Sequence, residues 1–223
     1  MSTRGGLLAS LADAVCSVEP GHPTRVAIDG PPAAGKTRLS AELAVVLRAR
    51  GREVVEATIE EFLTVRSVRY RRGPDSAEGC YEDSFDFAAL HRVLLGPLGP
   101  GGDRRFQAAV YDKVADVALN PPVATASADA VLLFDGVFLL RPELVDAWDL
   151  RVFVSVSFEE AVARARTRDR SSSRSGDEVE RRYRGRYVPS QQRYFGTVRP
   201  AELADVVVRN DDIAAPVWEV RAR

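Results

Sequence analysis

Residues 30–37 read Gly-Pro-Pro-Ala-Ala-Gly-Lys-Thr and match the phosphate-binding loop pattern G-x-x-x-x-G-K-[ST]. The glycines permit backbone turns that a side chain would block, so that successive amide groups point inward toward phosphate oxygens. The pattern predicts that Lys36 reaches the β- and γ-phosphates of a nucleotide and that the Thr37 hydroxyl ligates Mg²⁺. The predicted nucleotide contacts are Gly30, Pro31, Pro32, Ala33, Ala34, Gly35, Lys36, Thr37 and Arg38.

The flanks of this loop carry the strand and the helix that such a loop needs. Residues 24–29 are a short β-branched run typical of a buried strand, and residues 37–50 carry leucines at helical spacing. The chain has only two lysines, Lys36 and Lys113, and uses arginine for its other cations. Because lysine is a compact point charge, its presence at position 36 favours a phosphate contact. A Gly/Pro-rich loop without a ligand is the alternative.

The composition is that of an ordinary globular chain. Its 223 residues suit a single domain over residues 1–223, with 45% hydrophobic and 28% charged residues. A net charge of −1 predicts no general affinity for nucleic acid, and no apolar stretch is long enough to cross a membrane. Cys16 and Cys80 lack metal-binding spacing, so we expect reduced thiols in a cytoplasmic protein.

Strand patterns alternate with helix patterns along the chain. Beyond residues 24–29, apolar runs predict strands at residues 53–58, 130–136, 150–155 and 204–209. Helical spacing predicts helices at residues 7–15, 86–95, 158–168 and 178–195, the last of them interrupted near Gly185 or Pro189. Residues 106–119 are typical of two short strands or a hairpin. The alternation implies an α/β fold with a parallel sheet covered on both faces, which binds ligands at the carboxyl ends of its strands.

Two acidic positions follow predicted strands. Asp135 closes an apolar strand, where an acid in nucleotide-binding proteins holds Mg²⁺ directly or through water. A turn-forming Asp-Gly pair with Gly136 is the alternative interpretation. Glu60 follows the second strand, where a carboxylate would orient an acceptor hydroxyl and accept its proton. For Glu60 and its neighbour Glu61, two solvated loop acids are the alternative.

Taken together, these residues resemble the uridine kinase family of P-loop small-molecule kinases. The resemblance covers nearly the whole chain and implies a P-loop kinase three-layer sandwich with a mostly parallel five-stranded sheet. It also implies ATP and Mg²⁺ as cofactors, an acceptor-binding insertion at residues 59–120 and an arginine-rich lid at residues 169–177. Beyond the loop it rests on residues 60–62, 70–76, 83–86, 110–112, 133–136, 164–174 and 204–208.

The resemblance also assigns roles to individual residues. Glu60 stands where the family has its catalytic aspartate, and Arg168, together with Lys36, is assigned to catalysis. Asp83 matches the family's acid for the ribose hydroxyls, and Tyr111 matches its aromatic contact to the nucleoside. Arg174, which lies in the lid, is assigned to the phosphates of ATP.

Two positions depart from the family pattern. Glu60 is one methylene longer than aspartate, and a misplacement near 1 Å can lower a rate about 10²-fold. The family's base-reading histidine has no counterpart, because Asp116 stands at about that offset and neither His22 nor His91 is near. Recognition of a pyrimidine is therefore not supported by these residues, and another hydroxylated small molecule can be the acceptor.

We accordingly expect an ATP-dependent phosphotransferase that acts on a hydroxyl of a nucleoside or related small molecule, with self-association left open. One alternative is a regulatory P-loop protein with weak ATPase activity. Another is a kinase of the same fold for a vitamin precursor or a sugar phosphate. Additional phosphate-binding arginines, such as Arg69, Arg71 or Arg72, would favour a phosphorylated acceptor.

Overall fold

Six strands form one sheet in the order β10–β9–β8–β1–β7–β2. The structure, a computed structural model, describes residues 3–168 and 175–221, without the side chain of Arg168. All structural statements concern those residues. The strands of the sheet are β1 (Thr24–Asp29), β2 (Val54–Thr58), β7 (Val131–Gly136), β8 (Leu150–Ser155), β9 (Val206–Arg209) and β10 (Val217–Val220).

The predicted parallel sheet is confirmed for five of these strands. β1 pairs in parallel with β7 and β8, β2 pairs with β7, and β9 pairs with β8. The sixth strand, β10, lies antiparallel to β9 at the edge and was not predicted. Its four residues are mostly exposed, so the sequence lacks the continuous apolar run that marks the buried strands.

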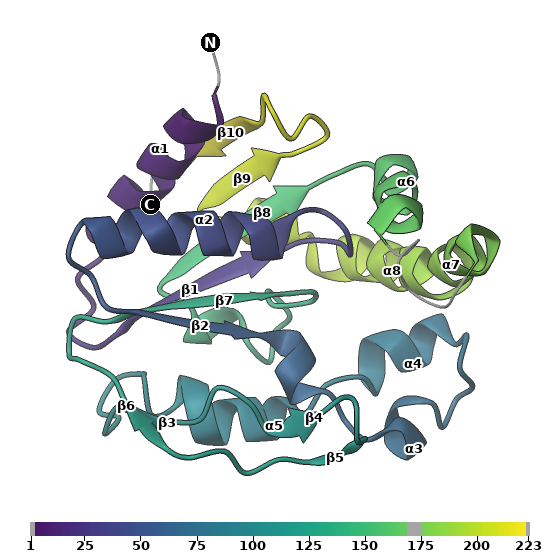
Figure 1. The fold of residues 1–223 in the computed structure, drawn as a ribbon, viewed down its shortest axis with the longest axis horizontal. Coiled ribbons are helices and arrows are strands. Elements are labelled where there is room, and N and C mark those ends of the chain that lie inside the picture. The colour runs from purple at the N-terminus through teal and green to yellow at the C-terminus, as the bar shows by residue number, and fades with distance from the viewer. Residues whose placement is uncertain (1–2, 169–174, 222–223) are drawn as a thin grey trace.

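Helices cover both faces of the sheet (Figure 1), which gives the three-layer arrangement. α1 and α2 lie on one face, while α5 and α8 lie on the other. The helices are α1 (Arg4–Cys16), α2 (Lys36–Ala49), α3 (Arg66–Arg69), α4 (Ala77–Glu82), α5 (Phe87–Leu90), α6 (Phe158–Arg168), α7 (Gly176–Arg182), α8 (Val188–Val198) and α9 (Pro200–Leu203).

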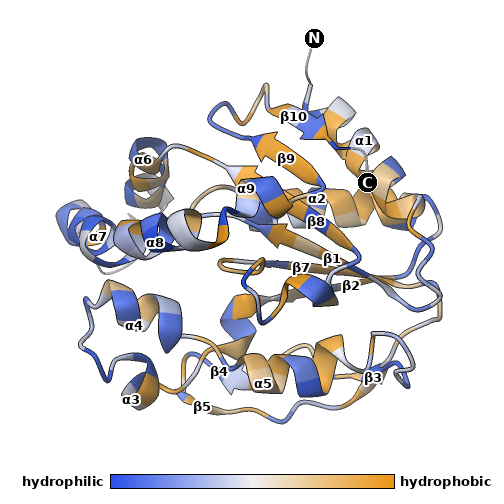
Figure 2. Ribbon diagram, turned by 180° about the vertical axis from the view of Figure 1, so that it is seen from behind, coloured by the Kyte–Doolittle hydropathy of each residue, from blue (hydrophilic) through white to orange (hydrophobic). Residues whose placement is uncertain are grey.

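Alternation of side chains along the buried strands creates two cores. Val26 and Ile28 of β1 pack into the cluster that contains the leucines of α1 and α2, whereas Ala27 packs into the cluster on the opposite face. That second cluster contains Trp148 and Tyr194. Figure 2 shows the strands coloured mainly hydrophobic and α7 mainly hydrophilic. Burying a large apolar side chain contributes about 1.5–3 kcal/mol, so both faces of the sheet need their helices.

Residues 59–120 leave the end of β2 and pack beside it (Figure 1). They begin with a 3₁₀ turn at Ile59–Phe62 and continue through α3, α4, α5 and a π-helical turn at His91–Leu95. The predicted hairpin is confirmed in a shorter form, β4 with β5, while Phe106 pairs with Ala124 instead. The short strands are β3 (Arg105–Phe106), β4 (Tyr111–Asp112), β5 (Val117–Ala118) and β6 (Ala124–Thr125).

The carboxyl ends of three neighbouring strands meet beside the phosphate-binding loop. Asp135 on β7 is in register with Ile28 on β1 and with Thr58 on β2. α6, α7, α3 and α4 gather at this same end of the sheet (Figure 1). The predicted helix at residues 178–195 forms α7 and α8, which are joined by a π-helical turn at Tyr183–Tyr187 instead of a break.

Both cysteines are free thiols, as expected, with Cys80 buried and Cys16 partly exposed. Across the described part of the chain, the helices are all too short or too polar to span a bilayer.

Candidate active site

The phosphate-binding loop lies against its neighbours so closely that its glycines cannot carry side chains. A Cβ on Gly30 would lie 2.2 Å from the carbonyl oxygen of Val154 on β8. Gly35 has a left-handed backbone with φ of +91°, and a Cβ there would lie 2.8 Å from the amide nitrogen of Asn210. The two glycines therefore let the loop pass between β8 and the segment that follows β9.

Asn210 holds the loop from outside the motif. Its side-chain amide is buried and donates a hydrogen bond to the carbonyl oxygen of Ala34 at 2.7 Å. This residue was not predicted from the sequence. Its position one residue after β9 was an available signal, because ligands of parallel sheets bind at the carboxyl ends of the strands.

Lys36 begins α2, and its side chain turns back onto the loop. The amine donates a hydrogen bond to the carbonyl oxygen of Pro31 at 2.8 Å, and the residue is only 7% exposed. A compact cation held within a loop of backbone amides is suited to a phosphate group. Lys36 thus lies against the loop, and its contact with the β- and γ-phosphates stays a prediction.

Thr37 and Asp135, which are 98 residues apart in sequence, meet at the end of β7. The Thr37 hydroxyl donates a hydrogen bond to a carboxylate oxygen of Asp135 at 2.7 Å. Burial raises the pKa of Asp135, although the Thr37 hydrogen bond and the charge of Lys36 act in the opposite direction. Mg²⁺ prefers hard oxygen ligands and keeps several waters, so this hydroxyl–carboxylate pair fits Mg²⁺.

Glu60 lies in the 3₁₀ turn that follows β2. Its side chain is 65% exposed and lines the same cavity as the loop, whereas Glu61 does not line it. The amine of Lys113 lies 3.7 Å from Glu60 and 4.0 Å from Glu61. The structure thus brings Glu60, as the sequence predicts, to the end of the sheet where Asp135 lies.

A cavity of about 1020 Å³ joins these groups. Small-molecule sites commonly measure about 300–1,000 Å³, so this space is large enough for a nucleotide with a second small molecule beside it. Its walls come from three parts of the chain. They are Lys36, Thr37 and Asp135 near the phosphate loop, Glu60, Arg69 and Tyr70 from residues 59–120, and Arg164, Arg182 and Arg186 from α6 to the π-helical turn.

The two predicted acceptor residues do not line this cavity. Asp83 is buried and bonded by Arg71 and Arg72, and these contacts, the hydrogen bond from Arg71 foremost, lower its pKa. The Tyr111 hydroxyl donates a hydrogen bond at 2.5 Å to Asp116. Both side chains lie behind the wall that residues 59–120 form, so their direct contact with an acceptor stays a prediction.

The predicted arginines lie in different environments. Arg164 lines the cavity but is bonded to Glu160 at 2.7 Å, and Arg38 is exposed and bonded to Glu42 at 2.7 Å. Arg174 and the side chain of Arg168 lie outside the described residues, as does most of the predicted lid at residues 169–177. Their phosphate contacts therefore stay predictions.

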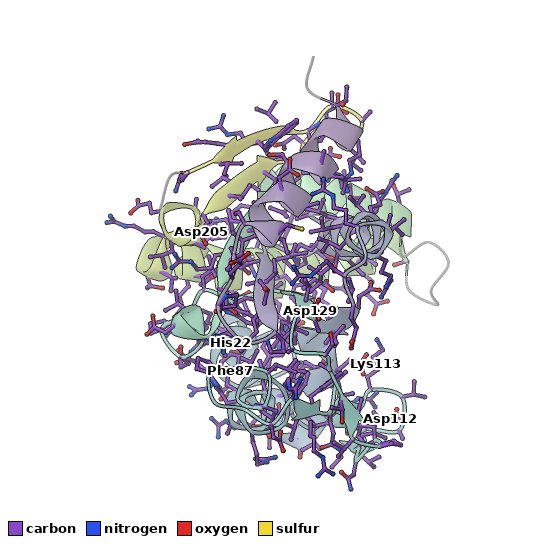
Figure 3. The ribbon with its side chains drawn as sticks, turned by 90° about the vertical axis from the view of Figure 1, so that its left-hand side faces the viewer. His22, Phe87, Asp112, Lys113, Asp129 and Asp205 are labelled. Carbon is purple, nitrogen blue, oxygen red and sulfur yellow. The ribbon has the colours of Figure 1, made fainter. Side chains whose placement is uncertain are left out.

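Neither histidine is a cavity residue. His22 precedes β1 at the amino end of the sheet, which faces the viewer in Figure 3, and lies 3.8 Å from Asp149. His91 bonds to the backbone of Glu143 through its Nε2 at 2.9 Å. Both fit the sequence interpretation that assigned them no role.

Asp29 is a buried carboxyl group directly before the loop, and the sequence analysis did not identify it. It accepts a hydrogen bond from the Tyr194 hydroxyl at 2.6 Å and another from the backbone amide of Leu139 at 3.3 Å. Burial raises the pKa of Asp29 to about 6, while these hydrogen bonds and the charge of Lys36 lower it. Asp29 thus links β1 to α8 beneath the loop.

Comparison with protein families gives one match over most of the chain. Residues 25–212 match the model of the cytidylate kinase-like family. A comparison with curated proteins finds no match.

Solved structures with the same fold cover most of this chain. A possible uridine kinase from Bacillus stearothermophilus has a TM-score of 0.72 and 22% identity, over 91% of this chain and 97% of that one. A candidate fructose transport system kinase from Silicibacter sp. TM1040 has a TM-score of 0.70 and 23% identity, over 85% and 94%. D-glycerate 3-kinase from Cryptococcus neoformans has a TM-score of 0.62 and 15% identity, over 84% and 85%. These likenesses show the P-loop kinase fold.

Proposed function

This chain belongs to the cytidylate kinase-like family, and from that premise we propose that it is an ATP-dependent kinase of a hydroxylated small molecule. One observation carries the proposal. The phosphate loop, the Thr37–Asp135 pair and Glu60 line a single cavity at the carboxyl ends of β1, β7 and β2. A phosphoryl donor and an acceptor can therefore be held side by side.

The donor half of the site consists of the loop and the residues beside it. Loop amides, the positive end of α2 and the Lys36 amine would bind the phosphates of ATP. Thr37 and Asp135 would hold Mg²⁺, which supplies charge neutralisation at the β- and γ-phosphates when bound. The hydrogen bond between Thr37 and Asp135 keeps these two oxygen ligands together.

The acceptor half provides the group that receives the proton. The acceptor hydroxyl oxygen forms a bond to the γ-phosphorus, and the bond from that phosphorus to the β–γ bridging oxygen breaks. ADP leaves with the electron pair of the broken bond, and the hydroxyl proton passes to the Glu60 carboxylate. A phosphorylated acceptor, ADP and one proton are the products.

The geometry of the cavity is compatible with several chemical classes of acceptor. The structurally similar proteins are named for uridine, fructose transport and D-glycerate. A nucleoside is one candidate acceptor, but Asp116 bonds to Tyr111 and to the backbone of Arg66 and does not line the cavity, so it offers no group for reading a base.

A coupled assay of ADP release tests this function. Purified protein would be given Mg·ATP with nucleosides, pantothenate and sugar phosphates in turn, and with no acceptor as the control. We expect at least one acceptor to raise ADP release well above the control and to appear as a phosphorylated product by mass spectrometry. ADP release that no acceptor changes would instead support the regulatory P-loop protein with weak ATPase activity.

A further inference from the structure

Three arginines surround one tyrosine in the wall of the cavity opposite the phosphate loop. The guanidinium carbons of Arg69, Arg182 and Arg186 lie 5.1, 6.0 and 5.1 Å from the centre of the Tyr70 ring. All four side chains line the cavity. We call these residues, Arg69, Tyr70, Arg182 and Arg186, the arginine cluster.

The arginine cluster has no carboxylate partner within the part of the chain that the structure describes. Arg182 donates hydrogen bonds to the hydroxyls of Tyr187 at 2.9 Å and Tyr70 at 3.0 Å. Arg69 donates to the backbone of Thr64 and to the hydroxyl of Tyr111.

Arg186, the third arginine, donates to the backbone oxygens of Pro74 and Ser76. Every described acceptor of the cluster's guanidinium groups is thus a neutral oxygen. Asp116 acts on Arg69 only from beyond the Tyr111 hydroxyl, so none of the three arginines has a described carboxylate in direct contact.

Other arginines near the cavity are neutralised. Arg71 and Arg72 are both bonded to Asp83, and Arg164 is bonded to Glu160. The sequence suggested Arg69, Arg71 and Arg72 as contacts for an acceptor phosphate. Arg71 and Arg72 are held at Asp83, and of the three only Arg69 lines the cavity. The arginines of the cluster thus differ from these cavity neighbours, which a carboxylate holds.

Like charges gathered in a partly buried wall repel one another, and the low local dielectric strengthens that repulsion. Arg69 is only 8% exposed and Arg186 only 2%. An anion placed between them would relieve the repulsion and gain charge-assisted hydrogen bonds. Among described atoms, none accepts a hydrogen bond from the Nη1 of Arg182, so that nitrogen is available to such an anion.

The position of the cluster relates it to the acceptor and not to ATP. Arg69 and Tyr70 come from residues 59–120, the segment that also carries Glu60, and not from the loop or the helix α2. Arg182 comes from the end of α7 and donates a hydrogen bond to the Tyr70 hydroxyl. The Tyr70–Arg182 hydrogen bond thus joins the two walls between which an acceptor would enter.

We propose that the acceptor carries an anionic group, a phosphate or a carboxylate, in addition to the hydroxyl that is phosphorylated, and that Arg69 and Arg182 bind this group. The inference rests on the proposed kinase function and adds the charge of its substrate. Planar guanidinium groups suit both anions because each can accept two parallel hydrogen bonds. Arg186, which is held by the backbone oxygens of residues 74–76, lies over the Tyr70 ring and adds its charge.

Matched pairs of probe compounds test the charge directly. Each pair has an anionic and a neutral member with similar hydroxyls: D-ribose 5-phosphate with D-ribose, pantothenate with panthenol, and glycerate with glycerol. Phosphoryl transfer from Mg·ATP is measured for each compound. Binding is measured separately as the rise in melting temperature with saturating Mg·AMPPNP present, so that the phosphate loop is already filled.

The variant Arg182→Gln removes the charge, Arg182→Lys keeps it, and Arg184→Gln is the matched control. Arg184 is two residues away, exposed, bonded to Glu180 and outside the cavity lining. We expect the anionic member of at least one pair to exceed its neutral partner about 10- to 100-fold in kcat/KM or affinity. Arg182→Gln should abolish that preference without changing KM for ATP, Arg182→Lys should retain part of it, and Arg184→Gln should retain all of it.

The results that would contradict the anionic acceptor differ from those that would contradict the kinase function. Phosphorylation of neutral members as fast as anionic ones, or an anion preference that survives in Arg182→Gln, overturns the anionic acceptor while the kinase stands. Anion binding without transfer of phosphate supports the arginine site and counts against the kinase. If no pair shows a difference in either assay, or if Arg182→Gln raises KM for ATP instead, the cluster does not serve the acceptor.

Discussion

Glu60 lines the cavity, and its exposed side chain can adopt several conformations. Its side chain is 65% exposed, and its nearest described cation is the Lys113 amine at 3.7 Å. The extra methylene relative to aspartate lets the carboxylate reach over a range of positions. An acceptor bound beside it would restrict that range, which is how one carboxylate can both orient a hydroxyl and take its proton.

The change Glu60→Gln keeps the size of the side chain and removes its ability to accept a proton. We expect phosphoryl transfer to fall about 10²- to 10⁴-fold, the usual contribution of a general base. ATP binding should be unchanged, because the phosphate loop makes no described hydrogen bond with Glu60. Steady-state kinetics and the melting shift with Mg·ATP measure the two effects.

Glu61→Gln is the matched control, since Glu61 is adjacent, lies near the same lysine and does not line the cavity. It should keep normal turnover. If Glu60→Gln also keeps normal turnover, Glu60 is not the base.

Single residues were predictable where local sequence fixes their position. The loop motif places Lys36 and Thr37, and the end of an apolar strand places Asp135. Arg182 and Asn210 were not predictable, because Arg182 meets Tyr70 from 112 residues away and Asn210 meets Ala34 from 176 residues away. The spacing of Arg182 and Arg186 on one helix face was the only local signal of a shared role.

At the scale of elements, the buried pair Asp29–Tyr194 joins β1, the loop and α8. The hydrogen bond between them is 2.6 Å long, and the backbone of Leu139 in the segment after β7 donates to the same carboxyl group. The pair therefore ties the element that carries the loop to the helix beside the arginine cluster, and its strength depends on protonation.

The raised pKa of Asp29, which is caused by burial, makes the stability of the folded protein depend on pH. Burial raises the pKa to about 6 from an ordinary value of 3.8, so the folded protein holds the proton more tightly than the unfolded chain. The stabilising contribution is full below about pH 4 and is lost as the pH rises through about 6. The free energy of unfolding of the wild type, minus that of Asp29→Asn, should fall by roughly 2 kcal/mol between pH 4 and pH 7.

Urea unfolding of both proteins at several pH values measures this difference. Asp13→Asn serves as the control, because Asp13 is an exposed carboxylate on α1, and its difference from the wild type should show no comparable fall. If the curves for the wild type and Asp29→Asn run parallel from pH 4 to pH 7, Asp29 does not titrate in this range.

The elements were predictable to the extent that their patterns are local. Three of the five parallel strands, β1, β7 and β8, are largely apolar and buried, which is the strongest strand signal, whereas β2 is only half-buried. β10 has only four residues at an edge and is defined by pairing with β9 rather than by its own pattern. The π-helical turn at Tyr183–Tyr187 is bonded to residues 74–76 through Arg186, a contact distant in sequence that no local pattern indicates.

At the scale of the whole molecule, the cavity has two halves with different chemistry. In the proposed function, the loop, Lys36 and the Thr37–Asp135 pair would form the donor half, and residues 59–120 with α7 would form the acceptor half. The sheet positions the donor half from neighbouring strands, which makes that half rigid. The proposed acceptor half is built from short helices and turns outside the sheet (Figure 1), so it can vary among proteins of this fold.

The melting temperature of the protein with and without Mg·ATP, compared between the wild type and Lys36→Ala, tests most directly that this loop is the ATP site. Ligand at 100 times its Kd contributes about 2.7 kcal/mol, which for a chain of this size is about 5–10 °C. We expect that rise in the wild type and none in Lys36→Ala, each measured against its own ligand-free protein. An equal rise in both proteins would contradict the account, because ATP would then bind without the loop lysine.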